Sequence, residues 1–554
     1  MDINVLSKIP SDWWKSAVLY QIYPRSFYDA DNNGIGDLAG VTQKLDYLND
    51  GKGGGLGVDA IWLSPFFKSP MKDFGYDVSD FYDIDPIFGT MKDLDKMVES
   101  AHRRGIKILV DLVLNHCSDQ HPWFWESKKD RSNPKADWFV WKEKGADGNP
   151  PNNWLGVFGG SAWEYDFNRD QYYLHSFLKE QPDLNWYNEE VREAIRDIIR
   201  FWTKKGIDGF RLDTVNYYAY DQELRDNPKL PKDHQSIENR EGVDYDQYDA
   251  CFSKDRPENF DCLKLIRTTI NENSSHVTTV GEIGGIQKLD QLIKLASSYV
   301  TGGQHLHMAY TFSMLRAKID AASFSHILDL TEKYIGDGWP CWSMGNHDCT
   351  RVRSRSETQK GIDWFHENLM LLLLCLRGTP IIYYGDELGM REYAIKKDEL
   401  RDPFGITYWP GYVGRDGCRT PFPWSHGKHA QGFNESAKPW LPANSDVSLD
   451  QQEKISDSMF ALTKEMIKIR KKHMALAIGD FRKIQTEGNM LAFQRKHKKE
   501  VIKVVCNFGE LPKVLEIDSK HWQPMPIRSF QRNGSLSENG LEIPAHGFSM
   551  VVEK

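Results

Sequence analysis

Acidic side chains follow three apolar stretches of the chain, at the point where each stretch ends. Asp213 closes GFRLD, Glu282 closes VGE and Asp348 closes NHD. Like charges brought close together push their pKa values apart, so one acid can stay ionised while another keeps its proton at neutral pH. A carboxylate nucleophile beside a protonated carboxylic acid is what glycoside hydrolysis requires. The three acids therefore indicate carbohydrate chemistry, provided that the fold brings them together.

The Asp213 stretch alone also fits a plainer interpretation. Arg211 lies two residues before Asp213, on the same face of a strand, and a buried Asp is usually paired. A strand end closed by an ion pair, or a cap for the next helix, would look the same. A fourth polar strand end, DLVLNH from Asp111 to His116, favours the functional interpretation, because four coincidences at one edge are hard to explain as separate caps.

Eight short apolar segments alternate with amphipathic ones between Ser16 and about residue 470. Several are too apolar to have a solvated face, as expected of a parallel sheet covered by helices. Eight strand and helix units predict an α/β fold, a closed (β/α)8 TIM barrel, in which polar residues at the carboxyl ends of strands face the substrate. The predicted strands are 18–22, 59–64, 106–113, 209–213, 278–282, 305–311, 341–345 and 380–384, with helices at 91–105, 188–206 and 455–473.

The spacing of the segments predicts two additions to the barrel. The interval after the third strand is rich in Trp, Pro, Asn and Gly and is too long for a structureless loop, so it is expected to form an inserted subdomain. Alternating apolar residues at 501–505 and 548–552 predict a C-terminal antiparallel β-sandwich domain. The predicted domains are 1–116 with 186–474 (barrel), 117–185 (insertion) and 475–554 (C-terminal domain).

Composition and charge exclude several other classes of protein. The net charge of -9 gives no reason to expect nucleic acid or an anionic membrane as partner. The longest apolar run, 369–376, is far shorter than the roughly 18 residues that span a bilayer, and the first 15 residues do not resemble a signal peptide. The eight cysteines are scattered without a Cys-x-x-Cys pair. A cytoplasmic protein without a membrane partner is expected.

Phosphoryl transfer is the competing chemistry of such barrels. No glycine-rich phosphate loop follows the last two predicted strands, where NHD and YGDE stand instead. The 18 tryptophans suit the flat faces of sugars, although core packing uses the same residues. Carbohydrate is the favoured substrate class.

These segments together resemble the signature regions of the α-amylase family of glycoside hydrolases, in its α-glucosidase and oligo-1,6-glucosidase branch. The similarity extends from QIYPRSF at 21–27 to the β tail. The resemblance implies that Asp213 is the nucleophile, Glu282 the general acid/base and Asp348 the carboxylate that binds sugar hydroxyls and stabilises the transition state. Arg211 would hold Asp213 ionised. The implied mechanism is double displacement with retention, which requires the two reacting carboxyls to lie about 5 to 5.5 Å apart.

The resemblance also implies a set of substrate-binding residues. An arginine in GRDGCR belongs to it, and Arg415 is favoured over Arg419. Phe158 and Phe177 resemble aromatics that line the pocket from the insertion, although they could also be core rings. The remaining implied ligands are Asp73, Tyr76, His116 and His347.

Two residues bear on the linkage. Gln181 begins QPDLN, the oligo-1,6-glucosidase version of a family motif, whereas Thr214 follows the nucleophile, where α-1,6-specific relatives have Val and α-1,4-specific ones Thr. A hydroxyl at the rim can orient a polar leaving group, which Val cannot. Hydrolysis of terminal α-1,4-linked glucose from maltose-type α-glucosides is expected, with possible sucrose hydrolysis and transglucosylation.

The segment from Asp29 to Asp37 alternates oxygen ligands as an EF-hand does, but its twelfth position is Gly40, so the bidentate glutamate is missing. In the resembling glucosidases this loop holds a structural Ca²⁺ or Mg²⁺. The resemblance assigns that role to Asp29, Asp31, Asn33, the carbonyl of Ile35, and Asp37; a solvated turn is the alternative. No organic cofactor is expected.

Three rival functions remain open. An oligo-1,6-glucosidase or a sucrose isomerase would share the carboxylates and differ in linkage or in what intercepts the intermediate. A non-enzymatic subunit, like the ectodomains of amino-acid transporter heavy chains, would lack the intact carboxylates or carry an anchor; both discriminators favour an enzyme. A monomer or a homodimer is expected.

Overall fold

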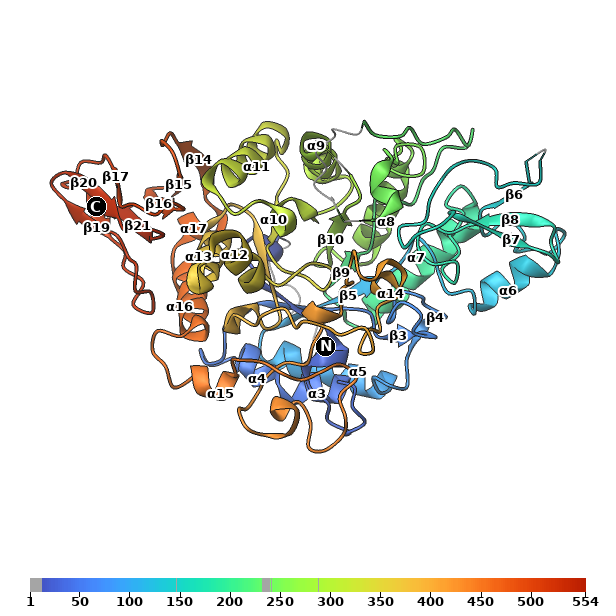
Figure 1. The fold of residues 1–554 in the computed structure, drawn as a ribbon, viewed down its shortest axis with the longest axis horizontal. Coiled ribbons are helices and arrows are strands. Elements are labelled where there is room, and N and C mark those ends of the chain that lie inside the picture. The colour runs from blue at the N-terminus through green and yellow to red at the C-terminus, as the bar shows by residue number, and fades with distance from the viewer. Residues whose placement is uncertain (1–11, 146, 232–239, 241, 287) are drawn as a thin grey trace.

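The computed structural model describes residues 12–145, 147–231, 240, 242–286 and 288–554 (Figure 1). Eight parallel strands among them pair in the order β11-β10-β9-β5-β2-β1-β13-β12. A parallel bridge from Ala309 of β11 to Pro340, just before β12, closes this sheet into a barrel. The strands are β1 (Leu19–Ile22), β2 (Ala60–Leu63), β5 (Lys107–Leu112), β9 (Gly209–Leu212), β10 (Thr278–Ile283), β11 (Met308–Thr311), β12 (Cys341–Ser343) and β13 (Thr379–Tyr383).

The predicted barrel is confirmed, with small differences at the strand ends. The sixth strand begins at Met308 rather than His305, and the seventh ends at Ser343 rather than Gly345. Six of the eight strands are buried along their whole length, and β5 and β11 have one half-buried end residue each, as expected when helices cover the outside of the sheet and side chains fill the inside.

The barrel helices follow from amphipathic sequence and from their caps. In α7 (Glu189–Lys204) the Asn188 side chain accepts from two first-turn amides, and one apolar face of the helix is buried. α13 (His366–Cys375) is buried all round, which explains the apolar run seen in the sequence. No helix in the described parts of the chain is long and apolar enough to cross a membrane. Other helices of the ring are α5 (Met91–Arg103), α8 (Asn259–Asn273), α9 (Leu289–Val300), α11 (Ala321–Tyr334) and α16 (Met459–Lys472).

The segment between β5 and α7 forms a small unit of its own. α6 (Pro122–Lys129) packs through Phe124 on the rings of Trp141 and Tyr173 from an antiparallel sheet of order β6-β8-β7. Its strands are β6 (Trp141–Lys142), β7 (Trp163–Asp166) and β8 (Gln171–Leu174). These elements fall within the predicted insertion; its exact boundaries stay a prediction. A short hairpin that the sequence did not indicate, β3 (Phe67–Lys68) with β4 (Asp80–Ile84), follows β2.

The C-terminal residues form two antiparallel sheets, as predicted, with apolar residues of both in one core cluster. Figure 1 shows them at the opposite end of the molecule from β6 to β8. One sheet has the order β14-β15-β16-β21-β18 and the other β17-β20-β19. Their strands are β14 (Asp480–Ile484), β15 (Met490–His497), β16 (Glu500–Asn507), β17 (Lys513–Leu515), β18 (Trp522–Pro524), β19 (Ser535–Ser537), β20 (Gly540–Ile543) and β21 (Phe548–Glu553).

Candidate active site

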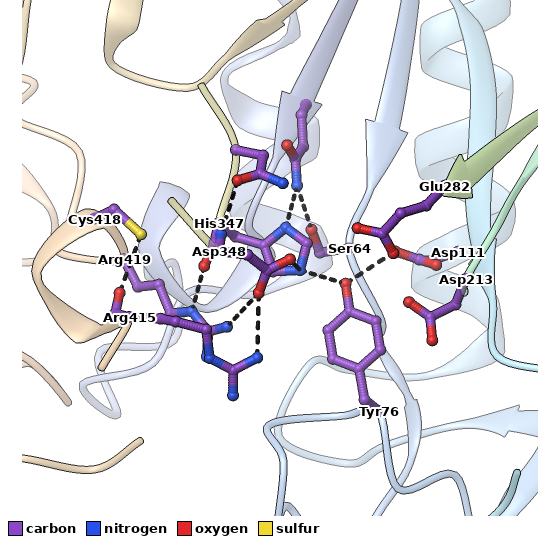
Figure 2. A network of polar contacts seen from close by, with 12 residues as sticks. Ser64, Tyr76, Asp111, Asp213, Glu282, His347, Asp348, Arg415, Cys418 and Arg419 are labelled. Carbon is purple, nitrogen blue, oxygen red and sulfur yellow. Dashed lines mark hydrogen bonds and ion pairs between the residues drawn. The ribbon is translucent and has the colours of Figure 1, made fainter. Parts of the chain in front are cut away.

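A cavity opens at the carboxyl ends of the barrel strands. It brings the three predicted acids to one wall, together with most of the other residues expected at the site. Figure 2 shows Asp213, Glu282 and Asp111 on one side of Tyr76, and Asp348 with Arg415 and Arg419 on the other. The lining residues are Asp73, Tyr76, His116, Val157, Phe158, Phe177, Asp213, Thr214, Tyr217, Arg240, Tyr245, Glu282, Gly284, Gly285, Phe312, Arg316, His347, Asp348, Phe404, Tyr412 and Arg415.

Arg211, fully buried in β9, joins the carboxyls on its own and the neighbouring strands. Its NH1 donates to Asp213 Oδ1 at 2.6 Å and to Asp111 Oδ1 at 2.7 Å, and its NH2 donates to Glu282 Oε2. Because one guanidinium binds both Asp213 and Glu282, the two carboxyls lie beside the same planar group. This favours the short separation of a retaining enzyme over the wide separation of an inverting one; the expected distance itself stays a prediction.

Glu282 and Asp348 have opposite protonation preferences. Burial raises the pKa of Glu282 well above its ordinary value, the negative charges of Asp213 and Asp348 raise it further, and Arg211 opposes them. Burial would also raise the pKa of Asp348, but the positive groups beside it outweigh burial and hold that pKa below its usual range. The two shifts have opposite directions: the site favours the protonated form of Glu282 and the ionised form of Asp348.

Two arginines bind Asp348. Arg415 NH1 and Arg419 NH2 each donate to Asp348 Oδ1 at 3.1 Å. Arg415 also donates to Asp73 Oδ1 at 2.8 Å and lines the cavity. Arg419 is fully buried, and its Nε donates to the carbonyl of His347 at 2.8 Å. The structure thus places Arg415 at the cavity wall and Arg419 behind it.

Tyr76 lies between the two acidic groups. Its hydroxyl is 2.6 Å from His347 Nε2 and donates to Asp111 Oδ2 at 3.2 Å. The rings of Tyr76 and His347 are parallel, with centroids 5.5 Å apart. Burial lowers the pKa of His347 well below its ordinary value, so the imidazole is neutral. These contacts fix Tyr76 and His347 as one rigid part of the wall.

The other predicted ligands close the same end of the cavity. His116 Nε2 lies 3.1 Å from the carbonyl of Tyr76, and burial lowers the pKa of His116 to about 4. Gln181 does not line the cavity; its Nε2 contacts His116 and donates to Asp73 Oδ2 at 3.3 Å, from behind. Phe177 packs on His116, and Phe158 packs on the Arg415 guanidinium, with 5.0 Å from its ring centroid to Cζ.

Thr214, on which the linkage prediction rests, lines the cavity directly after Asp213. Its Oγ1 donates to Asp213 Oδ2 at 3.1 Å. Its φ of +42° is unusual for a β-branched residue, so the surrounding structure must hold the backbone in this conformation.

Sequence reasoning missed several residues that line the cavity or bind the residues that line it. The Tyr310 hydroxyl donates to Glu282 Oε1 at 3.2 Å, and Asp402 binds Arg415 at 2.7 and 3.1 Å. Tyr310 stands in an apolar strand and has the pattern of a core ring; Asp402 ends no strand. The outer wall was missed entirely, because its residues come from loops and from two helices, α10 (Phe312–Arg316) and α14 (Pro403–Tyr408), that are too short to show a periodic pattern. They are Tyr217, Arg240, Tyr245, Gly284, Gly285, Phe312, Arg316, Phe404 and Tyr412.

The acidic loop lies apart from the cavity. Ligand-type oxygens of Asp29, Asp31 and Asp37 lie within 4.8 Å of one another. Burial raises the pKa of Asp31, and a hydrogen bond with Asp29 and the charge of Asp37 raise it further, so these carboxylates repel one another. A hard divalent cation would relieve that repulsion, and carboxylates are the ligands it prefers. Asn33 Oδ1 accepts from the Ile35 amide at 2.8 Å, within the same loop.

Comparison with known proteins gives matches over almost the whole chain. The profile described as alpha amylase, catalytic domain, matches residues 21–479. A probable alpha-glucosidase of Rhizobium meliloti is 42% identical over 542 residues, covering 97% of this chain and 96% of that protein. An oligo-1,6-glucosidase of Parageobacillus thermoglucosidasius is 36% identical over 542 residues, covering 91% and 92% of the two chains.

Two solved structures have the same fold over their whole length. The alpha-glucosyl transfer enzyme XgtA superposes with a TM-score of 0.90 at 39% identity, covering 98% of this chain and 99% of that one. The isomaltulose synthase SmuA from Protaminobacter rubrum gives 0.85 at 32% identity, covering 99% and 100%.

Proposed function

The chain belongs to the alpha-amylase family of glycoside hydrolases, and from this premise we propose that it is a retaining α-glucosidase that releases terminal α-1,4-linked glucose from maltose-type disaccharides and short oligosaccharides. The observation that carries the proposal is the single Arg211 guanidinium bound to both Asp213 and Glu282, at the wall of the cavity that also holds Asp348. The names of the relatives support the same reaction class.

In the proposed mechanism Asp213 attacks the anomeric carbon while Glu282 gives its proton to the glycosidic oxygen. The aglycone leaves, and a covalent β-glucosyl ester on Asp213 remains. Glu282, now ionised, takes a proton from the incoming water, which attacks the anomeric carbon and frees Asp213. The raised pKa of Glu282 supports its first role, and its contact with Arg211 supports the second.

The closed end of the cavity is the proposed site for the glucose that is transferred. Asp348 and Arg415 present charged oxygens and nitrogens at fixed positions, where they can bind sugar hydroxyls. Asp73, Tyr76, His116 and His347 complete this wall.

The α-1,4 preference rests on Thr214. Its hydroxyl lies at the cavity wall, within hydrogen-bond distance of Asp213, where it can also accept a bond from the leaving sugar. Rates on maltose, isomaltose and sucrose, measured side by side, test this preference. A larger kcat/KM for maltose is expected; a clear preference for isomaltose would overturn the linkage assignment and leave the reaction class intact.

Transfer to a sugar acceptor in place of water is part of the proposal, supported by the likeness to an alpha-glucosyl transfer enzyme. Sucrose isomerisation is the second candidate, because an isomaltulose synthase superposes over the whole chain. Product analysis at high maltose and at high sucrose separates the two. Glucose with maltose-derived trisaccharides supports the first, and isomaltulose or trehalulose as main product supports the second. Intact carboxylates argue against a subunit that only binds.

We further propose that the acidic loop binds a structural Ca²⁺ or Mg²⁺. Asp29, Asp31 and Asp37 would hold it through carboxylate oxygens, with Asn33 and the carbonyl of Ile35. Such an ion neutralises the loop; none of the catalytic steps above requires it.

A further inference from the structure

A strained segment delivers two residues to the sugar-binding end of the cavity. Met71 to Tyr76, between β3 and β4, carries Asp73 and Tyr76. Met71 and Phe74 have φ values of +62° and +49°, which residues other than glycine rarely adopt. Such a backbone persists only where neighbouring contacts hold it, so the question is what holds it.

One side of the segment is held by Asp77. Its carboxylate is buried and accepts from the Ser69 hydroxyl at 2.9 Å and from the amides of Lys72 and Asp73 at 2.8 and 3.0 Å. These bonds fix the backbone on both sides of Lys72. They do not reach Phe74, which needs another partner.

Arg25 supplies the contact on the other side. Its guanidinium carbon lies 5.1 Å from the ring centroid of Phe74, 4.8 Å from that of Trp440 and 5.9 Å from that of Phe88. Its NH1 lies 3.3 Å from Met71 Sδ. The cation therefore touches both residues of positive φ, one before and one after Asp73.

The environment of Arg25 is unusual for a cation. It is 7% exposed, makes no ion pair with any residue that the structure describes, and its Nε has no hydrogen-bond partner. A buried charge is normally paired with a carboxylate. Here aromatic faces make the direct contacts, which a planar guanidinium fits better than an ammonium does, while Asp85 and Asp77 attract the charge without an ion pair.

We propose that Arg25 is a positioning residue for glucose binding: clamped among Phe74, Phe88 and Trp440, it holds the strained segment so that Asp73 meets the sugar. The inference rests on the proposed function for the identity of the sugar. The Asp73 carboxylate accepts from Arg415 and Gln181, and these bonds require the backbone of the segment to stay where it is. Release of the segment would rotate Asp73 away from the cavity.

The test is glucose binding to Arg25→Met, measured by titration calorimetry, which requires no turnover. A weakening of about tenfold is expected, on the scale of one lost hydrogen bond to a charged group. KM for 4-nitrophenyl α-glucoside should rise by a similar factor, with kcat within about threefold of wild type. The reason is that the lost contact stabilises the bound substrate and the transition state equally. Arg25→Lys keeps the charge, so its glucose affinity and KM should fall between those of wild type and Arg25→Met.

Arg532→Met is the matched control. Arg532 also stacks on tryptophan, 3.3 Å from the ring centroid of Trp364, in the C-terminal part of the chain. It should lower the melting temperature and leave glucose binding unchanged. Glucose binding by Arg25→Met within twofold of wild type, with a lowered melting temperature, would reduce Arg25 to a structural role.

Phe74→Leu gives another, milder variant should Arg25→Met fail to fold. It removes the ring and keeps the cation, so it should weaken glucose binding about threefold to tenfold. Adding Arg25→Lys to Phe74→Leu should weaken glucose binding little further, because both changes break the same contact. Full additivity would overturn the clamp. Wild type that binds glucose but hydrolyses no α-glucoside would refute the proposed function alone; the binding comparison still decides on Arg25.

Discussion

The two ends of the cavity are built in different ways. At the closed end, charged side chains bind one another: Arg415 joins Asp73, Asp348 and Asp402. At the mouth, many of the lining side chains are rings, among them Tyr217 from the loop after β9, Phe312 from the short helix α10 (Phe312–Arg316) and Phe404 from the short helix α14 (Pro403–Tyr408). Mutually bonded charges have one geometry, whereas rings offer broad faces with few directional groups. The closed end should therefore select the transferred sugar strictly, and the mouth should select the leaving or accepting group loosely.

The largest effect is expected from Asp213→Asn, at the boundary between the two ends. The amide cannot form the glycosyl ester, so kcat/KM should fall by at least about 10⁴-fold on every α-glucoside. Steady-state rates and trapping of the intermediate by mass spectrometry measure this. Substantial activity in purified Asp213→Asn, with reversion to Asp excluded, would contradict the mechanism.

Glu282→Gln should discriminate between leaving groups. It removes the acid, so the rate on maltose should fall about 10²-fold to 10⁴-fold, and less for a 4-nitrophenyl glucoside, whose leaving group needs no proton. Because burial raises the pKa of Glu282, its acid form persists to a higher pH than that of a free Glu, and wild-type activity on maltose should be lost as the pH rises through that pKa. The first step with the aryl glucoside should lack this alkaline limb; equal loss on both substrates would reassign the acid.

Asp402→Asn tests the closed end. The neutral amide weakens the bonds that orient Arg415, and KM should rise about tenfold on maltose and on sucrose alike, because the glucose unit is common to both. Asp221→Asn is a matched control, since Asp221 binds Arg225 in a similar pair that does not line the cavity. A KM change confined to one of the two sugars would break the comparison between the ends.

Thr214→Val tests the mouth and should have a smaller effect. The hydroxyl is lost and the volume kept, so the ratio of kcat/KM values for maltose and isomaltose should fall by about tenfold or less, while the glucose dissociation constant stays unchanged. The ratio of kcat/KM values and the glucose dissociation constant are measured on the same preparation of each protein. An unchanged linkage ratio would move specificity to the rings of the mouth.

The smallest effect is expected at the acidic loop, outside both ends. Chelator treatment should lower the melting temperature by about 2 to 5 °C, restored by added Ca²⁺ or Mg²⁺. Asp31→Asn, which weakens the ion site, should respond less. A melting temperature insensitive to chelator would make the loop a solvated turn.

The same contrast decides what the sequence could reveal. The eight strands followed from the apolar segments of the sequence, and the three acids from those segments that end in a polar residue, because a barrel places such ends at one rim. Asp402 and Tyr310 could not be found this way. Asp402 binds Arg415 from the N-cap position of α14 (Pro403–Tyr408), and Tyr310 resembles any ring of a buried strand. The mouth is assembled from loops and from two short helices, whose contacts are set by packing and not by periodicity, so no pattern marked its residues. Sequence thus reveals positions set by the repeat of the fold, and misses those set by loop packing.

Backbone hydrogen bonds connect the acidic loop to the residues that contact Phe74, near the sugar-binding end of the cavity. The Gly36 amide donates to the carbonyl of Arg25 at 2.8 Å, and the Trp440 amide donates to the carbonyl of Gly34 at 2.9 Å. Both partners of Phe74 are therefore bonded to the backbone of the loop. If an ion in the loop strengthens the contacts of Arg25 and thereby glucose binding, bound glucose must strengthen ion binding by the same free energy, because such coupling is reciprocal. The concentration of sugar in its surroundings would then set how firmly the protein keeps its ion.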